Sequence, residues 1–356
     1  MSGPVAFVSD TREFGGAERY AAVLVEALRG ECEFVAILGD DAAAETRDRL
    51  ERAGARVVLV RGAARRRPGP AGVRHLRNAI HAASPALVHV SLSDQGDGLG
   101  ALLAARLAGR PTVATLHIVV PGRALWRETF SRAALRVPRR VIAVSEAVAE
   151  YLRLRGISAT VVANGLPETA PDPEADRLLG VGPADFVVGG VGRLHRQKGW
   201  DVLCRAADLV RAEVPRAAFV VIGDGAERER LAGSSECGSV RFLGYRESAG
   251  SLVSGFDVLV IPSRYEGFGL VAVEAMQAGV PIVATRAGGL AEVVGDCGEL
   301  VPPEDAQALA RAIVRLAREP DRRRELAERG RERARERFGV ERMARETLAV
   351  YRAAAP

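Results

Sequence analysis

The stretch from Pro262 to Thr285 combines turn residues, a helical pattern and acidic side chains at a spacing that could bind an anionic, hydroxylated ligand. The apolar run at 258–261 predicts a strand before it, and Gly267-Phe268-Gly269 predicts a tight turn. Residues 270–278 then predict a helix that ends at Gly279. The first backbone N–H groups of a helix have no partner within it and attract anions, so this junction favours phosphate.

Two carboxylates flank the predicted turn. Glu266 precedes it and Glu274 lies eight residues later, which in continuous helix would be a separation of about 12 Å. Carboxylates repel phosphate but accept hydrogen bonds from hydroxyl groups. The pattern therefore predicts a nucleoside diphosphate sugar, with sugar hydroxyls near Glu266, the diphosphate at the helix start and the ribose near Glu274. The alternative is an ordinary strand–helix–strand crossover with solvated glutamates.

A second group of candidate ligand-binding residues lies further toward the N-terminus. Lys198 is the only lysine among 50 basic residues, which suggests a need for a compact ammonium group, although chance could also leave one lysine. Arg193 precedes it, and both side chains could reach a diphosphate. Further along, Gly223-Asp224-Gly225 and Tyr245 follow predicted strands, where glycines could leave room for a flat base.

Two alternating series of strands and helices must position these residues. The first half has apolar, strand-like runs at 4–10, 33–38, 56–60, 86–91, 112–116 and 140–144. The second half has them at 186–191, 218–222, 240–243, 257–261 and 281–284. Strands that alternate with helices predict parallel sheets covered on both faces. The proline-rich and acidic segment 166–183 is typical of a linker, so the chain is predicted to be α/β with two doubly wound, Rossmann-like domains.

The first half carries its own candidate site residues. Gly15-Gly16 stands at a strand-to-helix junction, where the backbone could approach a ligand closely. His117 follows the strand at 112–116, the position where open α/β sheets bind ligands, so we interpret it as an active-site group or, alternatively, a structural histidine. The arginine-rich stretch after Gly122 predicts either an amphipathic helix that touches a membrane or acceptor, or a surface helix.

Composition excludes several classes of protein. No run of eighteen apolar residues exists and the N-terminus has no signal-peptide pattern, which favours a cytoplasmic protein. The four scattered cysteines are interpreted as reduced packing residues, with no zinc site. The net charge of +5 arises from an arginine excess in residues 1–168. That excess could attract an anionic acceptor or the inner face of a membrane, or reflect arginine-biased composition alone; no nucleic-acid partner is expected.

Together these motifs resemble glycosyltransferase family four, the retaining enzymes of the GT-B fold, over nearly the whole chain. The residues that carry the resemblance are Gly15-Gly16-Ala17-Glu18, Thr115-Leu116-His117, Val144-Ser145, Asn164-Gly165, Gly192-Arg193-Leu194, Gln197-Lys198-Gly199, Gly223-Asp224-Gly225 and the EX7E pair Glu266 and Glu274. The resemblance implies an acceptor-binding domain at 1–168 and a nucleotide-sugar-binding domain at 169–337, which face each other across a cleft. It also implies that the final helix, 338–356, crosses back to the first domain.

The resemblance also implies roles for single residues. Arg193 and Lys198 would bind the donor diphosphate, His117 would lie over the reacting sugar, and the backbone at Phe268, Gly269, Leu270 and Val271 would contact sugar and phosphate. Two departures from the family pattern are Ile118, where relatives often have aspartate, and Leu166-Pro167-Glu168, where relatives often have an aspartate-containing turn.

The implied activity is retaining transfer of a hexosyl group from a UDP- or GDP-linked sugar to a glycan, lipid or small-molecule hydroxyl. No DxD triplet is present, so no metal and no cofactor besides the donor is expected. A GT-B nucleotide-sugar epimerase or phosphorylase is the alternative enzyme, and a non-catalytic nucleotide-sugar sensor is the alternative class. A dinucleotide dehydrogenase is disfavoured because no GxGxxG follows the first strand.

Overall fold

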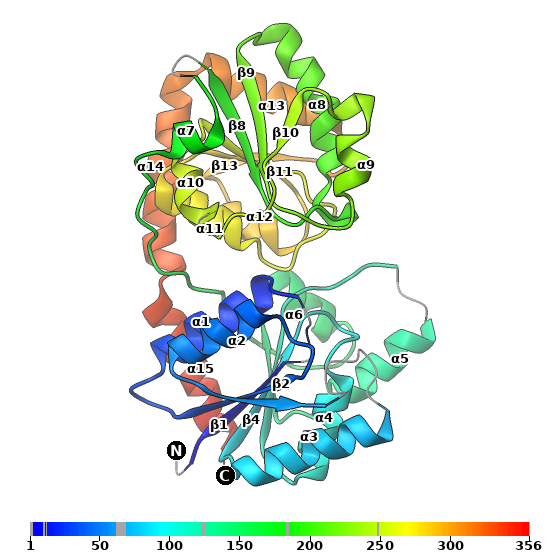
Figure 1. The fold of residues 1–356 in the computed structure, drawn as a ribbon. Helices are drawn as coiled ribbons and strands as arrows, with labels where there is room; N and C mark the ends of the chain where they lie inside the picture. Colours follow the sequence, from blue (N-terminus) through cyan, green and yellow to red (C-terminus); the bar gives the residue numbers. More distant parts are fainter. Residues whose placement is uncertain are drawn as a thin grey trace. The chain divides into compact units, whose positions relative to one another are not determined.

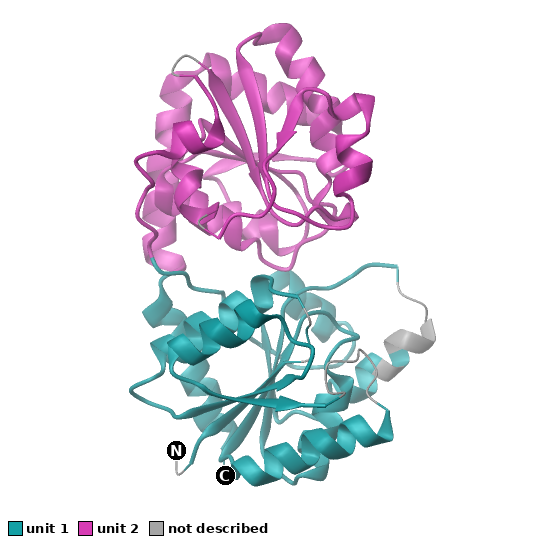
Figure 2. Cartoon of the chain, viewed as in Figure 1, with its two compact units in different colours: residues 1–167, 339–356 teal, residues 168–338 magenta. Residues whose placement is uncertain are grey.

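The computed structural model describes residues 3–9, 11, 13–61, 69–122, 125–182, 185–247 and 249–355, with 125–128 and 130 described by their backbone alone. The chain divides into two compact units (Figure 2). Unit 1 comprises residues 1–167 and 339–356, and unit 2 comprises 168–338. Each unit holds one parallel sheet with helices packed around it (Figure 1), which confirms the predicted α/β class with two Rossmann-like sheets.

Unit 1 contains a seven-stranded parallel sheet in the order β3-β2-β1-β4-β5-β6-β7. Its strands are β1 (Val5–Ser9), β2 (Phe34–Gly39), β3 (Arg56–Val60), β4 (Leu87–Leu92), β5 (Thr112–Leu116), β6 (Arg140–Ala143) and β7 (Thr160–Val161). Its helices are α1 (Gly16–Ala27), α2 (Ala44–Ala53), α3 (Pro70–Ala83), α4 (Leu99–Leu107), α5 (Leu125–Ala134), α6 (Glu146–Arg153) and α15 (Val340–Ala354). The strand order reverses between β1 and β4, so the carboxyl ends of these two strands form the topological switch point of the unit.

Unit 2 contains a six-stranded parallel sheet in the order β10-β9-β8-β11-β12-β13. Its strands are β8 (Phe186–Val191), β9 (Ala217–Ile222), β10 (Val240–Phe242), β11 (Val258–Ile261), β12 (Ile282–Thr285) and β13 (Gly298–Val301). Its α-helices are α7 (Ala175–Leu179), α8 (Trp200–Glu213), α9 (Arg228–Ala232), α10 (Ala249–Leu252), α11 (Leu270–Ala278), α12 (Gly289–Val294), α13 (Ala306–Arg318) and α14 (Pro320–Arg337). Short 3₁₀ turns are η1 (Arg196–Lys198), η2 (Ser235–Cys237) and η3 (Val253–Gly255). Here the order reverses between β8 and β11.

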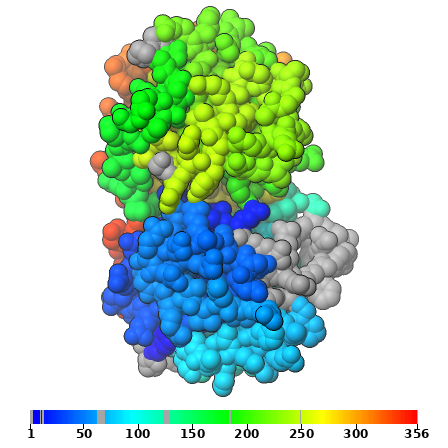
Figure 3. All heavy atoms as spheres, in the orientation of Figure 1, coloured from blue at the N-terminus to red at the C-terminus, as the bar shows by residue number. Residues whose placement is uncertain are grey.

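Apolar side chains cover both faces of each sheet, so the central strands are buried on both sides. In unit 1 the core includes Phe7, Tyr20 and Leu24, and α15 adds Met343 and Tyr351. The space-filling view shows blue and cyan atoms, from the early part of the chain, over much of the face of unit 1 that is turned to the viewer (Figure 3). In unit 2 the side chains of α8 and α13 pack together against the sheet. Uninterrupted apolar strands of this kind are what made both sheets predictable.

The cysteines are a correction to the sequence-based interpretation. Cys204 on α8 and Cys237 in η2 form a disulfide, with their Cα atoms 4.6 Å apart, so they are not reduced packing residues. They are separated by 33 positions in the sequence, and α8 packs against η2 only in the folded unit, so their proximity could not be read from spacing. Cys32 and Cys297 are free and buried, as expected.

Two short edge strands were not predicted. β7 has two residues, and β13 contains a glycine and a glutamate and is only partly buried, so neither forms an apolar run. Of the basic loop predicted at 61–72, residues 62–68 lie outside the described residues, as does Arg123 of the arginine-rich stretch. In the part of the chain that is described, no helix is long and apolar enough to cross a membrane.

Candidate active site

The topological switch point of unit 2 brings two loops together. β8 and β11 are neighbours in the sheet, and the loops that follow them lie at the carboxyl ends of the strands, where open α/β sheets bind ligands. One loop, residues 192–199, carries Arg193 and Lys198, and the other, residues 262–269, carries Glu266. Sequence positions that are almost seventy residues apart therefore meet at one edge of the sheet.

An ion pair joins the two loops. The Nζ atom of Lys198 lies 2.5 Å from Oε1 of Glu266, and the hydroxyl of Ser263 donates to the same oxygen at 3.0 Å. The side chains of Lys198 and Glu266 are 18% and 8% exposed, so water screens the pair weakly. The aliphatic stem of Lys198 lies beside Gly192, where a Cβ atom would be 3.6 Å from Cε of the lysine. A cation and a hydroxyl-accepting carboxylate are thus held side by side.

Backbone contacts fix the register of these loops. Gly199 adopts a φ of +68°, and a Cβ atom there would lie 2.0 Å from the carbonyl oxygen of Pro262, so only glycine fits. The amide of Arg264 donates to the carbonyl of Gln197 at 2.8 Å. The side-chain amide of Gln197 in turn donates to the carbonyl of Tyr265 at 3.1 Å. The loops therefore approach each other at backbone distance.

Sequence reasoning missed the side chains that surround this contact. Arg264, two residues before Glu266, pairs with Asp201 in the first turn of α8 and with Glu304 after β13. Burial raises the pKa of Asp201, but the hydrogen bonds and charge of Arg264 outweigh it and leave the pKa below its usual value. Two features of the sequence could have pointed to these residues. Arg264 lies inside the stretch from Pro262 to Thr285, and Asp201 lies three residues after Lys198.

The amino end of α11 forms the third part of the site. Gly269 precedes the helix with a φ of +94°, and a Cβ atom there would lie 2.7 Å from Cδ1 of Leu290. Phe268 is buried and its ring packs edge-on against Phe338, with centroids 5.5 Å apart. Leu270 and Val271 are partly buried at the start of the helix. The turn thus presents the first N–H groups of α11 at the carboxyl edge of the sheet, where they favour an anion.

Glu274 lies one turn further along α11 and is 5% exposed. Its Oε1 atom would be 3.0 Å from a Cβ atom at Gly250, so the carboxylate is directed toward α10. The structure therefore pairs Lys198 with Glu266, whereas Glu274 borders a different neighbour. Any ribose contact by Glu274 remains a prediction.

The glycines after β8 and β9 are explained by backbone packing. A Cβ atom at Gly223 would lie 2.0 Å from the carbonyl oxygen of Gly192, and one at Gly225 would lie 2.6 Å from that of Leu194. Both glycines have φ near +150°. Close backbone packing is therefore enough to explain why glycine occupies positions 223 and 225, without a need to leave room for a flat base. The same packing places the loops after β8 and β9 side by side.

The remaining predicted polar residues of unit 2 lie at its surface. Asp224 is exposed and pairs with Arg228, with an Nη1–Oδ2 distance of 3.2 Å. Tyr245 is 56% exposed. Arg193 is exposed, and its carbonyl accepts a hydrogen bond from Trp200 Nε1 at 2.8 Å, which anchors its backbone to the core. Asp224, Arg193 and Tyr245 are therefore exposed residues of the loops that follow β9, β8 and β10.

His117 belongs to the switch-point edge of unit 1. Its amide donates to the carbonyl of Leu92 at 3.0 Å, its Nε2 atom lies 3.1 Å from the Ser91 hydroxyl, and the Tyr20 ring packs edge-on against it. Desolvation by the surrounding protein lowers the pKa of His117 to about 3, although part of the side chain remains accessible. The imidazole is therefore neutral at pH 7 and can act as a hydrogen-bonding group but not as a cation.

The Gly15-Gly16 junction lies near the end of β1 in the same unit. Gly15 caps α1 in an extended conformation, with a φ of −156°, which any residue can adopt. The Thr11 hydroxyl donates to the buried carboxylate of Glu18 in the first turn of α1. The junction is therefore ordered by a side chain, and a ligand contact there remains a prediction.

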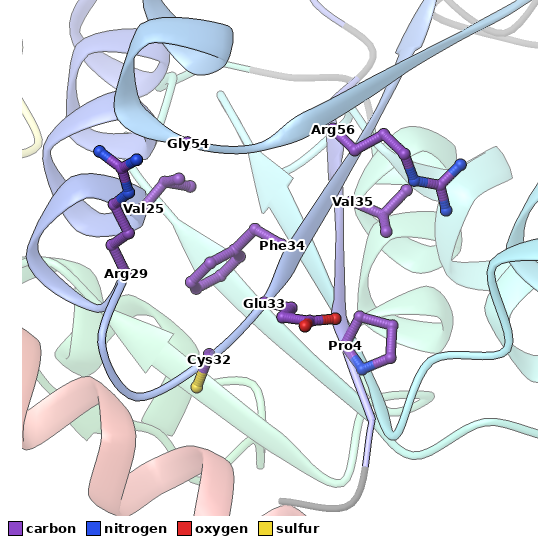
Figure 4. A pocket seen from close by; sticks show the side chains of 9 residues that line it. All are labelled: Pro4, Val25, Arg29, Cys32, Glu33, Phe34, Val35, Gly54 and Arg56. Carbon is purple, nitrogen blue, oxygen red and sulfur yellow. The ribbon is translucent and has the colours of Figure 1, made fainter.

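A pocket of about 420 Å³ lies at the opposite edge of the unit 1 sheet, before the first residues of β1, β2 and β3 (Figure 4). Its lining includes Arg29, Cys32, Glu33 and Arg56. The close-up shows the guanidinium groups of Arg29 and Arg56 on different sides of the pocket, so they do not converge on one ligand. None of the predicted site residues lines it.

Both units match known family models. The model described as Glycosyltransferase Family 4 matches residues 14–169, and the one described as Glycosyl transferases group 1 matches residues 185–319. An α-maltose-1-phosphate synthase from Mycolicibacterium smegmatis is 32% identical over 72% of this chain and 76% of its own length. The chain belongs to the family 4 glycosyltransferases, sugar-transferring enzymes, which confirms the resemblance seen in the sequence.

One further sequence relative and one solved structure are similar to this chain. The 2-deoxystreptamine N-acetyl-D-glucosaminyltransferase of Streptomyces fradiae is 35% identical over 64% of this chain, and the match spans 62% of that protein, less than two thirds. The crystal structure of HepE from Anabaena in complex with UDP-glucose has a TM-score of 0.81 and 25% identity, and the match covers 98% of this chain and 99% of HepE. The fold is therefore that of a GT-B glycosyltransferase.

Proposed function

We propose that this protein is a retaining hexosyltransferase that moves a sugar from a nucleoside diphosphate to an acceptor hydroxyl. The observation that carries the proposal is the contact between Lys198 and Glu266 at the switch point of unit 2, beside the start of α11. A single small region thus offers a cation, helix N–H groups and a carboxylate, the three features that a diphosphate sugar needs. HepE, which shares the fold, binds UDP-glucose. We therefore propose that the donor is a UDP-linked sugar rather than a GDP-linked one.

In the proposed reaction, the bond between the anomeric carbon and the diphosphate oxygen breaks. A new bond forms on the same face of the sugar between that carbon and the acceptor oxygen, and the acceptor proton passes to the leaving phosphate. Negative charge grows on the diphosphate, where Lys198, Arg193 and the amino end of α11 would stabilise it. Glu266 would accept hydrogen bonds from the sugar hydroxyls and Glu274 from the ribose. His117, neutral at pH 7, would contribute a hydrogen bond rather than a charge.

The donor is identified first by binding. UDP, GDP and their hexose conjugates are screened for a rise in melting temperature of the purified protein, and the best donor is then incubated with a panel of hydroxylated acceptors. We expect a product whose anomeric configuration, measured by NMR, equals that of the donor, and a rate that persists in EDTA. An inverted product would refute retention, and epimerised donor without transfer would indicate the alternative enzyme.

Substitution of the lysine tests the residue assignment. Lys198→Ala should lower kcat by about 100-fold or more, because charge that develops on the leaving diphosphate loses its nearest cation. Arg322→Ala, which removes a surface ion pair with Glu299 in the same unit, is the matched control and should leave the rate unchanged. A Lys198→Ala enzyme with near wild-type turnover would remove the lysine from the mechanism.

A further inference from the structure

Arg264 has a complete set of hydrogen-bond partners beside the proposed donor site. Its Nη1 atom donates to the carbonyl of Arg196 at 2.6 Å and to Oδ1 of Asp201 at 2.9 Å. Its Nη2 atom donates to Oδ2 of Asp201 at 2.8 Å and to Oε2 of Glu304 at 3.0 Å, and its Nε atom donates to Oε1 of Glu304. All five N–H groups of the guanidinium are thereby used.

These partners come from three separate segments of unit 2. Arg196 lies two residues before Lys198 in η1, Asp201 lies in the first turn of α8, and Glu304 lies in the connection between β13 and α13. The guanidinium itself belongs to the loop that carries Glu266. The Arg264 side chain is 17% exposed and that of Asp201 is 20% exposed, so the contact between the loops is largely shielded from water.

Glu304, a partner of Arg264, has an unusual backbone conformation. It has a φ of +64°, in the left-handed region, one of two non-glycine residues with positive φ in the described chain. Such a conformation is strained for a residue with a Cβ atom and persists only where the surroundings enforce it. The bidentate contact of its carboxylate with Arg264 is a local interaction that stabilises this conformation.

We propose that Arg264 is a positioning residue for donor binding and transfer. It connects the loop of Lys198 to the loop of Glu266 through hydrogen bonds. The ammonium and the carboxylate therefore stay in contact, in the geometry that binds the diphosphate and the sugar. This inference rests on the proposed function. A lysine at position 264 would retain the charge but not the planar fork, so it could not bridge Asp201, Glu304 and the Arg196 carbonyl together.

The test compares Arg264→Lys with the matched control Arg322→Lys, which alters the ion pair of Arg322 with Glu299 elsewhere in unit 2, where Nε and Nη2 both contact Oε1 of the carboxylate. With UDP as probe, we expect Arg264→Lys to lower the ligand-induced rise in melting temperature and to lower kcat/KM for the donor by about 10- to 100-fold. The control should retain wild-type values for both. Asp201→Asn keeps the shape of the Asp201 side chain but removes the negative charge that pairs with Arg264, so it should reproduce the effect. It is the alternative test variant if Arg264→Lys does not fold.

A double-mutant cycle separates positioning from a general loss of stability. If Arg264 acts through Lys198, Arg264→Lys should have little further effect on kcat/KM in a Lys198→Ala background. Additive effects, or wild-type UDP stabilisation in both Arg264→Lys and Asp201→Asn, would overturn the inference. Failure of the proposed function is a distinct outcome, because the unmutated protein would then show neither stabilisation by UDP nor transfer of a sugar from any donor tested.

Discussion

His89 shows how a titratable residue can serve unit 1 without taking part in chemistry. It lies on β4 and is fully buried, with its Nδ1 atom 2.6 Å from the Tyr351 hydroxyl and its Nε2 atom 2.7 Å from the Thr115 hydroxyl. Burial, assisted by the neighbouring His117, lowers the pKa of His89 to about 3. The imidazole is therefore a neutral link between the sheet and α15.

This burial predicts the pH dependence of stability. Between pH 6.5 and 3 the unfolded chain protonates His89 but the folded protein does not, so the unfolded state binds more protons and the free energy of unfolding falls as pH falls. We expect a loss of about 1 kcal/mol per pH unit in that window from this histidine, and none above pH 7. Urea unfolding at pH 4 to 7, with hydrogen exchange in unit 1 as the readout, measures it.

Substitution assigns the slope to its source. His89→Asn should reduce the slope of the acid limb of the stability curve without abolishing it, because burial also lowers the pKa of His117 to about 3 and this second histidine contributes in the same window. The substitution also lowers stability at pH 7 through its lost hydrogen bonds. His81→Asn, at an exposed histidine on α3, is the control and should leave the curve unchanged. An unaltered acid limb in His89→Asn would show that other groups cause it.

At the scale of elements, the turn before α11 depends on one glycine. Gly269→Ala would force a Cβ atom into the left-handed region and to within 2.7 Å of Leu290. We expect a loss of about 1–3 kcal/mol in stability of unit 2, together with weaker stabilisation by UDP, because the start of α11 would shift. Thermal melts with and without UDP measure both effects.

Gly109→Ala is the matched control for that substitution. Gly109 also has a left-handed φ, +67°, but no atom lies within 4 Å of a Cβ atom built there. It should therefore show the conformational strain alone, with UDP binding unaffected. Equal effects of the two substitutions would mean that the contact with Leu290 is unimportant.

The same elements show what could be predicted from sequence. Strands 112–116 and 186–191 were predicted to the residue, because buried parallel strands are largely apolar runs. Strand 56–60 was also predicted to the residue, from its apolar residues alone, although it lies at the edge of its sheet and is mostly exposed or half-buried. The candidate loops were also found, since glycine and charge gather at strand ends. The contact of Lys198 with Glu266 and the disulfide of Cys204 could not be predicted, because each depends on how distant segments register in three dimensions.

At the scale of the whole molecule, α15 belongs to the first unit although it follows the second in sequence. Its Met343 and Tyr351 are fully buried in the core of unit 1, and its helix packs against α1 and β5. The Arg342 guanidinium also donates to the carbonyl of Ala163 at 2.7 Å. Unit 1 is thus built from two segments of the chain, 1–167 and 339–356.

Removal of this helix should therefore act on one unit only. Truncation after Gly339 would expose the apolar face that Met343 and Tyr351 cover, so we expect loss of hydrogen-exchange protection throughout unit 1 while unit 2 retains its own. Arg352→Ala, at an exposed position of the same helix, is the control and should change little. Protection of unit 1 that survives truncation would contradict this dependence.

The split of unit 1 has a consequence for biosynthesis. The ribosome synthesises all of unit 2 before α15 emerges. The N-terminal segment of unit 1 therefore keeps an uncovered apolar surface while unit 2 is being translated. The unit that begins translation is the one completed last, and chaperones that shield such surfaces would matter most during that interval.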